Sequence, residues 1–280
     1  MSGSFEVEKK IRVFTDVGDI IDAMKAYAGV AIRKTEGIIA NIREYEKNVL
    51  LALGDAVSGD AAARFAEPEG AKRLVVAFGS SQGLCGAYNE KIADALGDTV
   101  KSGDSLYVIG RRLRSALESR KVRHDAYQEF VAGVSGIEQA WRDCISRLLT
   151  LYRGGGYYNL ILLFTTVSEK QAAVSVEKIL PPDISRVRMR TERRQSPLMY
   201  VEPAMLFDWL LEEFISIGIY RGLVEALRSE NWYRLRSMEG ASENIRRHIT
   251  ELDSLRKYLR QEEITGEILE ILGSGGFFRL

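Results

Sequence analysis

The residues that could carry chemistry are concentrated in one glycine-rich stretch, Gly79–Asn89, which reads GSSQGLCGAYN. A turn of this kind, after a strand and before a helix, is where α/β enzymes bind phosphate. The stretch lacks the Gly-x-x-x-x-Gly-Lys-Ser/Thr spacing of a P-loop and the Gly-x-Gly-x-x-Gly spacing of a dinucleotide turn. We therefore favour a structural turn and keep phosphate binding as the alternative. The structural turn would comprise Gly83, Cys85, Gly86 and Asn89.

Nucleophilic or metal chemistry would depend on two cysteines, Cys85 and Cys144, and two histidines, His124 and His248. Cys85 precedes a predicted helix, whose N-terminus could lower the pKa of its thiol. No histidine lies near it in the sequence, so a buried structural cysteine is the simpler interpretation. Two cysteines and two histidines are too few to form a disulfide framework or a closed zinc site. We expect no catalytic residue, no metal site and no cofactor.

The charge balance excludes one large class of partners. The chain has 280 residues with 39 Lys and Arg against 39 Asp and Glu. Without a basic block there is no electrostatic footprint for a phosphate backbone, so nucleic acid is not an expected partner. No stretch approaches the roughly 18 apolar residues that cross a bilayer, and the N-terminus lacks a signal-peptide core. We expect a soluble chain that could still dock on a membrane complex.

Two long helices are expected at the ends of the chain, because its five prolines all lie between residues 68 and 203. Alternate steps of three and four through residues 14–52 meet apolar side chains everywhere except at Thr35. The same stepping through residues 238–262 gives a second seam, on which His248 fills a slot. A mean period of 3.5 is typical of helices that supercoil around a partner.

These seams predict an antiparallel coiled coil made from the two ends of one chain. The second helix is expected to run from about Pro203 to about Leu272, too long to be buried in a compact domain. Three glycines in the first helix weaken this prediction or mark close backbone approach: Gly18, Gly29 and Gly37.

The middle of the chain changes to short β-branched runs that alternate with helical patterns, which indicates a small α/β domain with a mostly parallel sheet. The runs are 72–79, 105–110 and 157–166, and the helical patterns are 88–96, 111–121 and 135–152. Gly154–Gly156 is interpreted as a helix stop. The fold class is therefore α/β plus a long antiparallel coiled coil. The expected domains are 1–67 for the first helix, 70–195 for the α/β domain and 200–280 for the second helix.

Three motifs in this order resemble the γ subunit of F-type ATP synthases. Ile20–Lys25 is similar to the family's Lys-Ile-Thr-Lys-Ala-Met-Lys, and Gly83–Asn89 to its Gly-Leu-Cys-Gly-Gly-Phe-Asn. The most specific is Leu259–Ile271, LRQEEITGEILEI, which matches Arg-Gln-x-x-Ile-Thr-x-Glu-Ile-x-Glu-Ile. The resemblance covers nearly the whole chain.

The resemblance implies a central-stalk rotor that couples ion-driven, including proton-driven, rotation of a c-subunit ring to ATP synthesis or hydrolysis at β subunits. The implied partners are three α and three β subunits, the ε subunit and the c-subunit ring, with no self-oligomer. The chain would be a non-catalytic subunit, peripheral to the cytoplasmic face of a prokaryotic cell membrane.

Position by position, the resemblance implies contacts with β subunits through Met24, Arg234, Arg260, Gln261, Thr265 and Glu267. For Met24 the simpler interpretation is coiled-coil packing, and for Arg234 a surface ion pair. Contacts with ε and c subunits would fall on Tyr200 and Glu202.

The chain departs from the family at several positions. Asp19 and Asp22 stand where the family usually has lysines, so charge contacts are not transferred there. The C-terminal residues 275–280, GGFFRL, replace a tail of small residues and would meet the apolar bearing of the ring.

Two other classes of protein stay open. One is an α/β enzyme that binds a nucleotide or small molecule and oligomerises through its helices; it would bind nucleotide as an isolated chain. The other is a coiled-coil scaffold, which would form a stable homodimer. The enzyme has no need of two paired seams and the Arg-Gln-x-x-Ile-Thr run, and the scaffold would have no affinity for α and β subunits.

Overall fold

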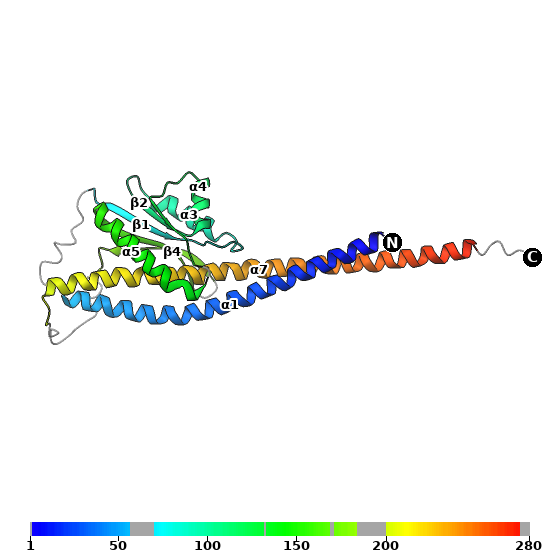
Figure 1. Ribbon diagram of the computed structural model, residues 1–280, viewed down its shortest axis with the longest axis horizontal. Coiled ribbons are helices and arrows are strands. Elements are labelled where there is room, and N and C mark those ends of the chain that lie inside the picture. The colour runs from blue at the N-terminus through cyan, green and yellow to red at the C-terminus, as the bar shows by residue number, and fades with distance from the viewer. Residues whose placement is uncertain (1, 57–69, 132, 169–170, 184–199, 275–280) are drawn as a thin grey trace, which may run out of the picture. The chain divides into compact units, whose positions relative to one another are not determined.

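The computed structural model describes residues 2–56, 70–131, 133–168, 171–183 and 200–274 (Figure 1). The chain divides into two compact units, Met1–Ala28 with Leu235–Leu280, and Gly29–Arg234. Each unit is described by itself below. The tail 275–280 and the end of the predicted first segment, 57–67, lie outside the described residues. The domain boundaries given from the sequence stay a prediction.

The two predicted long helices are present. Helix α1 runs over Ser2–Ala56 and helix α7 over Pro203–Ser274. In the unit that contains both chain ends, the Phe14 ring stacks on the His248 ring at 5.6 Å between centroids. In the other unit, Arg43 pairs with Glu225 at 2.9 Å, and Arg228 with Glu36 at 3.2 Å. In the unit that contains both chain ends, Gly18 also lies close to Ile245. In both units residue numbers therefore rise in α1 as they fall in α7, and the helices are antiparallel. The predicted fold class is confirmed.

Half of the positions of the predicted seam of α1 are buried. Five of its apolar side chains are at most 8% exposed: Ile21, Ala28, Ala31, Ile42 and Val49. Thr35, the polar exception, is buried as well, and its hydroxyl donates to the carbonyl of Ala31 at 2.9 Å. This local bond satisfies the hydroxyl inside the apolar seam. Val17 and Tyr45 remain exposed. No helix of the described chain is long and apolar enough to cross a membrane.

The α/β domain contains a five-stranded sheet in the order β3-β2-β1-β4-β5. The three predicted strands, β1 (Lys72–Phe78), β2 (Ser105–Ile109) and β4 (Tyr157–Ser168), are present and mutually parallel. Two strands were not predicted. Strand β3 (Ala126–Gln128) is only three residues long, and β5 (Gln171–Leu180) runs antiparallel to β4. Most of strand β5 alternates between exposed and half-buried residues, so its sequence lacks the apolar run that marked the other strands.

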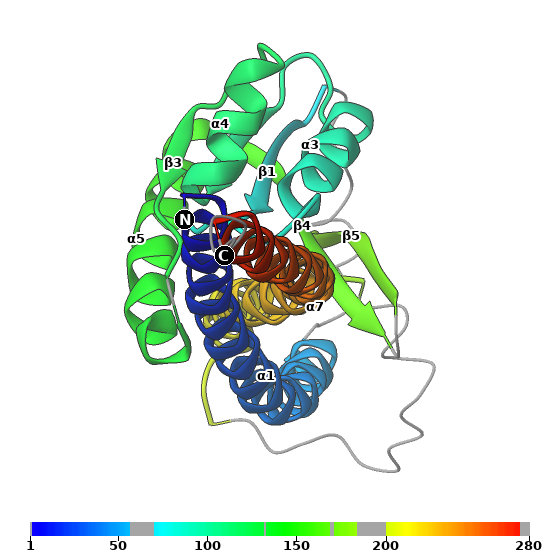
Figure 2. The same ribbon diagram turned by 90° about the vertical axis from the view of Figure 1, so that its right-hand side faces the viewer.

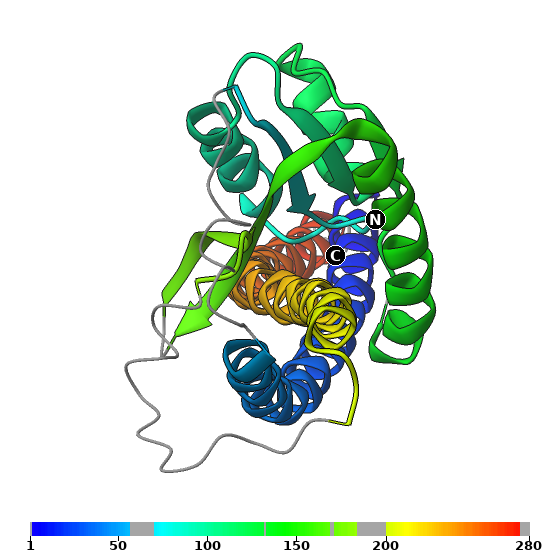
Figure 3. The ribbon, with the colours of Figure 1, turned by 90° about the vertical axis from the view of Figure 1, so that its left-hand side faces the viewer.

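The helices of the domain cover both faces of the sheet (Figures 2 and 3). Helices α3 (Tyr88–Thr99) and α4 (Arg111–Ser119) pack on one face. Helix α5 (Ile137–Gly155), preceded by the 3₁₀ turn η1 (Val134–Gly136), packs on the other with the first part of α7 and the end of α1. Gly156 ends α5 in the left-handed conformation at φ +64°, which confirms the predicted helix stop.

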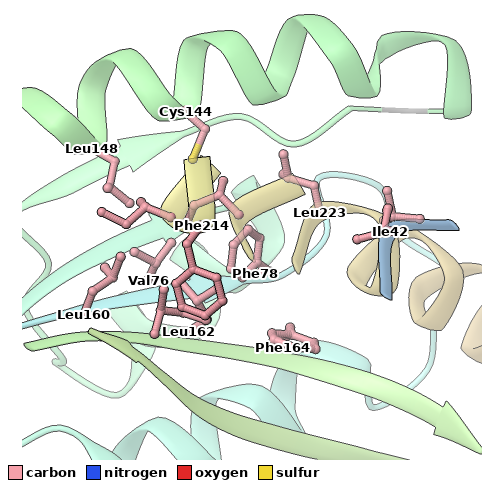
Figure 4. Packing of buried hydrophobic residues seen from close by; sticks show 14 of the residues in the cluster. Ile42, Val76, Phe78, Cys144, Leu148, Leu160, Leu162, Phe164, Phe214 and Leu223 are labelled. Atoms are coloured by element: carbon pink, nitrogen blue, oxygen red, sulfur yellow. The ribbon is translucent and has the colours of Figure 1, made fainter. Parts of the chain in front are cut away.

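Helix α7 lies close to the sheet at two glycines. A Cβ on Gly222 would stand 2.8 Å from the Phe78 ring, and one on Gly218 would stand 3.3 Å from Ile179. Phe78 lies in the core beside Phe164 and Leu223 (Figure 4). Glycine therefore permits a close helix-to-sheet approach, which a side chain at Gly222 would push apart and one at Gly218 would crowd.

The glycines of α1 have a different role. A Cβ on Gly37 would meet nothing within 4 Å, and one on Gly18 would make an ordinary contact with Ile245 at 3.7 Å. A Cβ on Gly29 would meet only a side chain of its own helix, Arg33, at 3.9 Å. The interpretation that these glycines mark close backbone approach is wrong, because each site has room for alanine.

We expect Gly222→Ala to destabilise the full chain by about 1–2 kcal/mol, because overpacking against Phe78 exceeds the gain in helix propensity. Gly240→Ala is the matched control on the same helix, since its Cβ would meet nothing within 4 Å. We expect the control to stabilise the chain by up to about 1 kcal/mol. Urea unfolding followed by circular dichroism measures both. Equal stabilisation by the two changes would contradict the close-packing account.

Candidate functional site

The glycine-rich turn is closed by its own side chains. Asn89 accepts a hydrogen bond from the backbone N–H of Ser80 at 3.0 Å and donates one to the Ser80 hydroxyl at 2.9 Å. Gly86 has φ +52°, a conformation that glycine adopts at little cost. Because the Ser80 amide is already bonded to Asn89, it is not free to bind a phosphate. These contacts suit a structural turn better than a phosphate cradle.

Cys85 lies inside this turn and is 3% exposed. Burial raises the pKa of its thiol, and the Ser80 hydroxyl at 3.5 Å only partly opposes that effect. A raised pKa keeps the sulfur protonated near neutral pH, whereas a nucleophile needs the thiolate. The simpler prediction, a buried cysteine, is confirmed. Among the described residues, no group of three or more His, Cys, Asp or Glu is placed to hold a metal ion.

Helix α7 contacts this turn through Arg234, which is 2% exposed. Its guanidinium donates to Asn231 at 2.9 Å, pairs with Glu230 and reaches the carbonyl of Gly83 at 3.5 Å. The interpretation of Arg234 as a surface ion pair is wrong, because the pair is buried. Its contact with a β subunit stays a prediction, and within this chain Arg234 connects α7 to the turn.

Glu230 is the acidic member of this buried pair. Burial raises its pKa to about 7, and the pairing with Arg234 lowers it less than burial raises it. Its second carboxylate oxygen has no hydrogen-bond partner among the described atoms. An unsatisfied buried oxygen favours the neutral carboxyl, which agrees with the direction of the shift.

A second set of buried charges on α7 was not anticipated from the sequence. Glu225 is fully buried, 2.9 Å from Arg43 of α1 and 3.7 Å from Arg228 of its own helix. Arg221 lies between Glu46 of α1 and Glu177 of β5. The three α7 residues follow the spacing i, i+4, i+7, which places them on one helix face. That spacing, inside a densely apolar stretch, was the available signal.

The predicted contact residues near the end of α7 are exposed. Arg260, Gln261, Thr265 and Glu267 all point to solvent in the described chain. Thr265 donates to the carbonyl of Gln261 at 2.7 Å, one helical turn back. Continuing the register of Phe14 with His248 places Ser2, the first residue of α1, opposite about residue 260.

Beyond that point α7 has no section of α1 beside it within this unit. Its apolar side chains are exposed there, including Ile264, Ile268, Leu269 and Ile271, the last at 69%. Single exposed apolar residues are ordinary, but a group on one helix end marks an interaction surface.

The remaining predicted contacts lie elsewhere. Tyr200 is 94% exposed, and Glu202 is exposed next to the start of α7, where its carbonyl accepts from Leu206 N–H at 3.0 Å. Met24 is half-buried on α1. Tyr200 and Glu202 belong to the unit of residues 29–234, whereas Met24 and the end of α7 belong to the unit that contains both chain ends.

Comparison with known proteins places these features in a family. The family model described as ATP synthase matches residues 4–275, so the chain belongs to the ATP synthase family. It is 26% identical over 287 residues to the ATP synthase gamma chain of Geotalea uraniireducens, covering 97% of each chain. It is also 26% identical to the gamma chain of Heliobacterium modesticaldum, covering 98% of each.

Solved structures show the same fold. A chain of the Euglena gracilis mitochondrial ATP synthase, in a structure of OSCP, F1 and c-ring, aligns with a TM-score of 0.66 at 16% identity, covering 99% of this chain and 97% of that one. A chain of the central stalk and c-ring of the Tetrahymena thermophila mitochondrial enzyme aligns with a TM-score of 0.62 at 19% identity, covering 80% and 99%.

We expect the pH dependence of stability to report the buried Glu230. Its folded pKa of about 7 exceeds the ordinary 4.5, so the folded chain holds a proton that the unfolded chain has lost between these values. Stability from this group is therefore full below about pH 4.5 and declines as pH rises to about 7, at up to about 1.4 kcal/mol per unit.

Glu230→Gln resembles the protonated form and removes this dependence. In urea unfolding between pH 4.5 and 8, the variant should gain stability relative to wild type as pH rises, until the difference becomes constant above about 7. Glu251→Gln, an exposed change on the same helix, is the control. A difference that does not vary with pH would show that folding does not raise the pKa of Glu230.

Proposed function

We propose that this chain, the central-stalk rotor subunit of an F-type ATP synthase, couples rotation of a c-subunit ring to conformational change at the catalytic sites of β subunits. The observation that carries the proposal is the end of α7, which is long, extends past the start of α1 and exposes apolar and polar side chains together. A surface of this kind is typical of a site that binds a partner, and an enclosing ring would cover it.

The proposed partners are a ring of three α and three β subunits around the coiled coil, and the ε subunit and c-subunit ring at the other end. An antiparallel pair of unlike helices has no threefold symmetry. Inside a threefold ring it presents a different face to each β subunit, so each catalytic site is biased toward a different conformation. Rotation then shifts these populations in sequence, through differential contact.

Within the proposed β contacts, Arg260 and Gln261 offer several hydrogen-bond donors to loop carboxylates and carbonyls. Their exposure leaves these donors accessible, and contacts of this kind can form and release on each turn. Thr265 and Glu267 lie within two helical turns of this pair. Met24 on α1 is the fifth proposed contact, half-buried against its own chain.

We assign Arg234 a less direct part in the β contact. At 2% exposure its side chain cannot reach a partner without leaving Glu230 and Gly83. It would act by holding the turn Gly83–Asn89 against α7, so that the surface beside it keeps one shape.

At the other end, Tyr200 and Glu202 are the proposed contacts with ε and c subunits. Both are exposed, and they immediately precede α7, so force applied there enters the helix directly. The complex would hold the chain peripherally at the cytoplasmic face of a prokaryotic cell membrane, where it would serve ion transport.

The test is ATP hydrolysis by α and β subunits of the same organism, co-expressed with this chain. We expect one copy of the chain per ring, and we expect Arg260→Ala/Gln261→Ala to lower turnover roughly tenfold, since one charge-assisted hydrogen bond is worth about 1.5 kcal/mol. The ring should still assemble, because the exposed apolar residues of the helix end are unchanged.

A matched control removes the same two residue types from another exposed helix face, as Gln139→Ala/Arg142→Ala on α5. This variant should hydrolyse ATP as the wild type does. If wild type neither co-purifies with the ring nor changes its activity, the rotor proposal fails. If both double variants lose activity equally, the assignment of Arg260 and Gln261 fails while the rotor role stands.

A further inference from the structure

One guanidinium joins three elements of the unit formed by residues 29–234. Arg221 of α7 donates from one terminal nitrogen to Oε1 of Glu177 at 3.1 Å, and its other terminal nitrogen pairs with Oε2 of the same carboxylate. Its Nε stands 2.9 Å from Glu46 Oε2 on α1, as an ion pair. The fork of Arg221 therefore contacts α1 and β5 from α7.

Strand β4 also contacts this cluster, through the ring of Phe164. The Arg221 Cζ lies 5.4 Å from the centroid of the Phe164 ring on β4, within cation–π range. The planar guanidinium thus has an aromatic face on one side and carboxylates at its edges, which fixes its orientation as well as its position.

Two of the three charged side chains, Arg221 and Glu46, are largely removed from water, whereas Glu177 is 33% exposed. The Arg221 side chain is 9% exposed. Burial raises the pKa of Glu46 more than Arg221 lowers it, so the net shift is upward. Burial also raises the pKa of Glu177, but the hydrogen bond and the charge of Arg221, together with Ser175 and Arg43, outweigh it and hold that pKa below its ordinary value. Arg43 and Ser175 are the other groups that influence these two carboxylates.

A buried ionic cluster is a weak source of stability. Desolvation offsets most of the attraction, and apolar side chains of similar volume often replace such a cluster without loss. Apolar packing has little directional preference, however, whereas a bidentate arginine fixes angle and register. The cluster is thus better suited to positioning three elements than to stabilising them.

We infer that Arg221 is a positioning residue that holds α1, α7 and the sheet in one rotational register while the rotor transmits torque. This inference rests on the proposed function. Force entering at Tyr200 and Glu202 reaches α7 first, and α1 and the sheet follow only as far as their contacts with α7 resist slippage. Arg221 resists it for both at one point, through Glu46 and Glu177.

The experiment uses the assembled enzyme in inverted membrane vesicles. ATP-driven ion pumping is followed with a voltage-sensitive dye, which responds to H⁺ and Na⁺ alike, and is divided by the rate of ATP hydrolysis in the same vesicles. For Arg221→Met we expect pumping per ATP to fall at least about twofold. Arg236→Met, an exposed arginine of the same helix paired with Glu239, is the control and should match wild type.

A second variant separates positioning from stability. Glu46→Met/Glu177→Met/Arg221→Met removes all three charges, and the melting temperature of the full chain should recover toward wild type. We expect its pumping per ATP to stay as low as that of Arg221→Met. Normal pumping per ATP in either variant would overturn the inference. A wild-type chain that supports no ATP-driven pumping would instead overturn the proposed function.

Discussion

The close packing of helix α7 on the sheet sets the other contacts within the unit formed by residues 29–234. At Gly222 the Phe78 ring occupies space that a Cβ would need, and at Gly218 the Ile179 side chain comes nearly as close. With its backbone held against the sheet, α7 turns its other faces toward α1 and toward the glycine-rich turn. Residues one turn apart on α7 therefore contact different elements. Gly222 packs against the sheet, while Glu225 pairs with Arg43 of α1.

The charged residues on α7 follow from this crowded position. A helix surrounded on several sides would ordinarily be apolar all round, yet Arg221, Glu225 and Arg234 are buried in its central part. Each has a partner from another element: Glu177 and Glu46, Arg43, and the Gly83 carbonyl. Burial of paired charge adds little net stability, but a misplaced element would leave a charge unpaired, which is costly. The charges therefore favour one arrangement of these elements over sliding alternatives.

The sequence predicted what depends on local periodicity and missed what depends on tertiary pairing. The seam through Thr35 could be recognised because a coiled coil repeats one pattern over many turns. His248, which was predicted to fill a slot of the second seam, stacks on Phe14 but stays exposed. Strand β5 (Gln171–Leu180) was missed because it lies at the edge of the sheet and is defined by its pairing with β4. Its exposed residues also interrupt the apolar run that marks the other strands. The site shows the same division. Arg260 was found through a motif, and the structure leaves it exposed. In contrast, nothing local indicates that Arg221 lies between Glu46 and Glu177, which are 175 and 44 residues earlier in the sequence.

The end of α7 combines two kinds of surface, and under the proposed function each has its own task. Exposed apolar residues such as Ile264 and Ile268 offer attraction without a preferred direction, so a helix bearing them can turn inside a ring without one deep energy minimum. Arg260 and Gln261 make directional hydrogen bonds, which can distinguish one β subunit from the next. If only directional contacts were present, the rotor would fall into a deep energy minimum at each third of a turn. If only apolar contacts were present, the rotor would not distinguish one β subunit from the others. With both kinds of contact, the apolar residues bind all three β subunits with similar strength, while the hydrogen bonds favour one β subunit at any given angle.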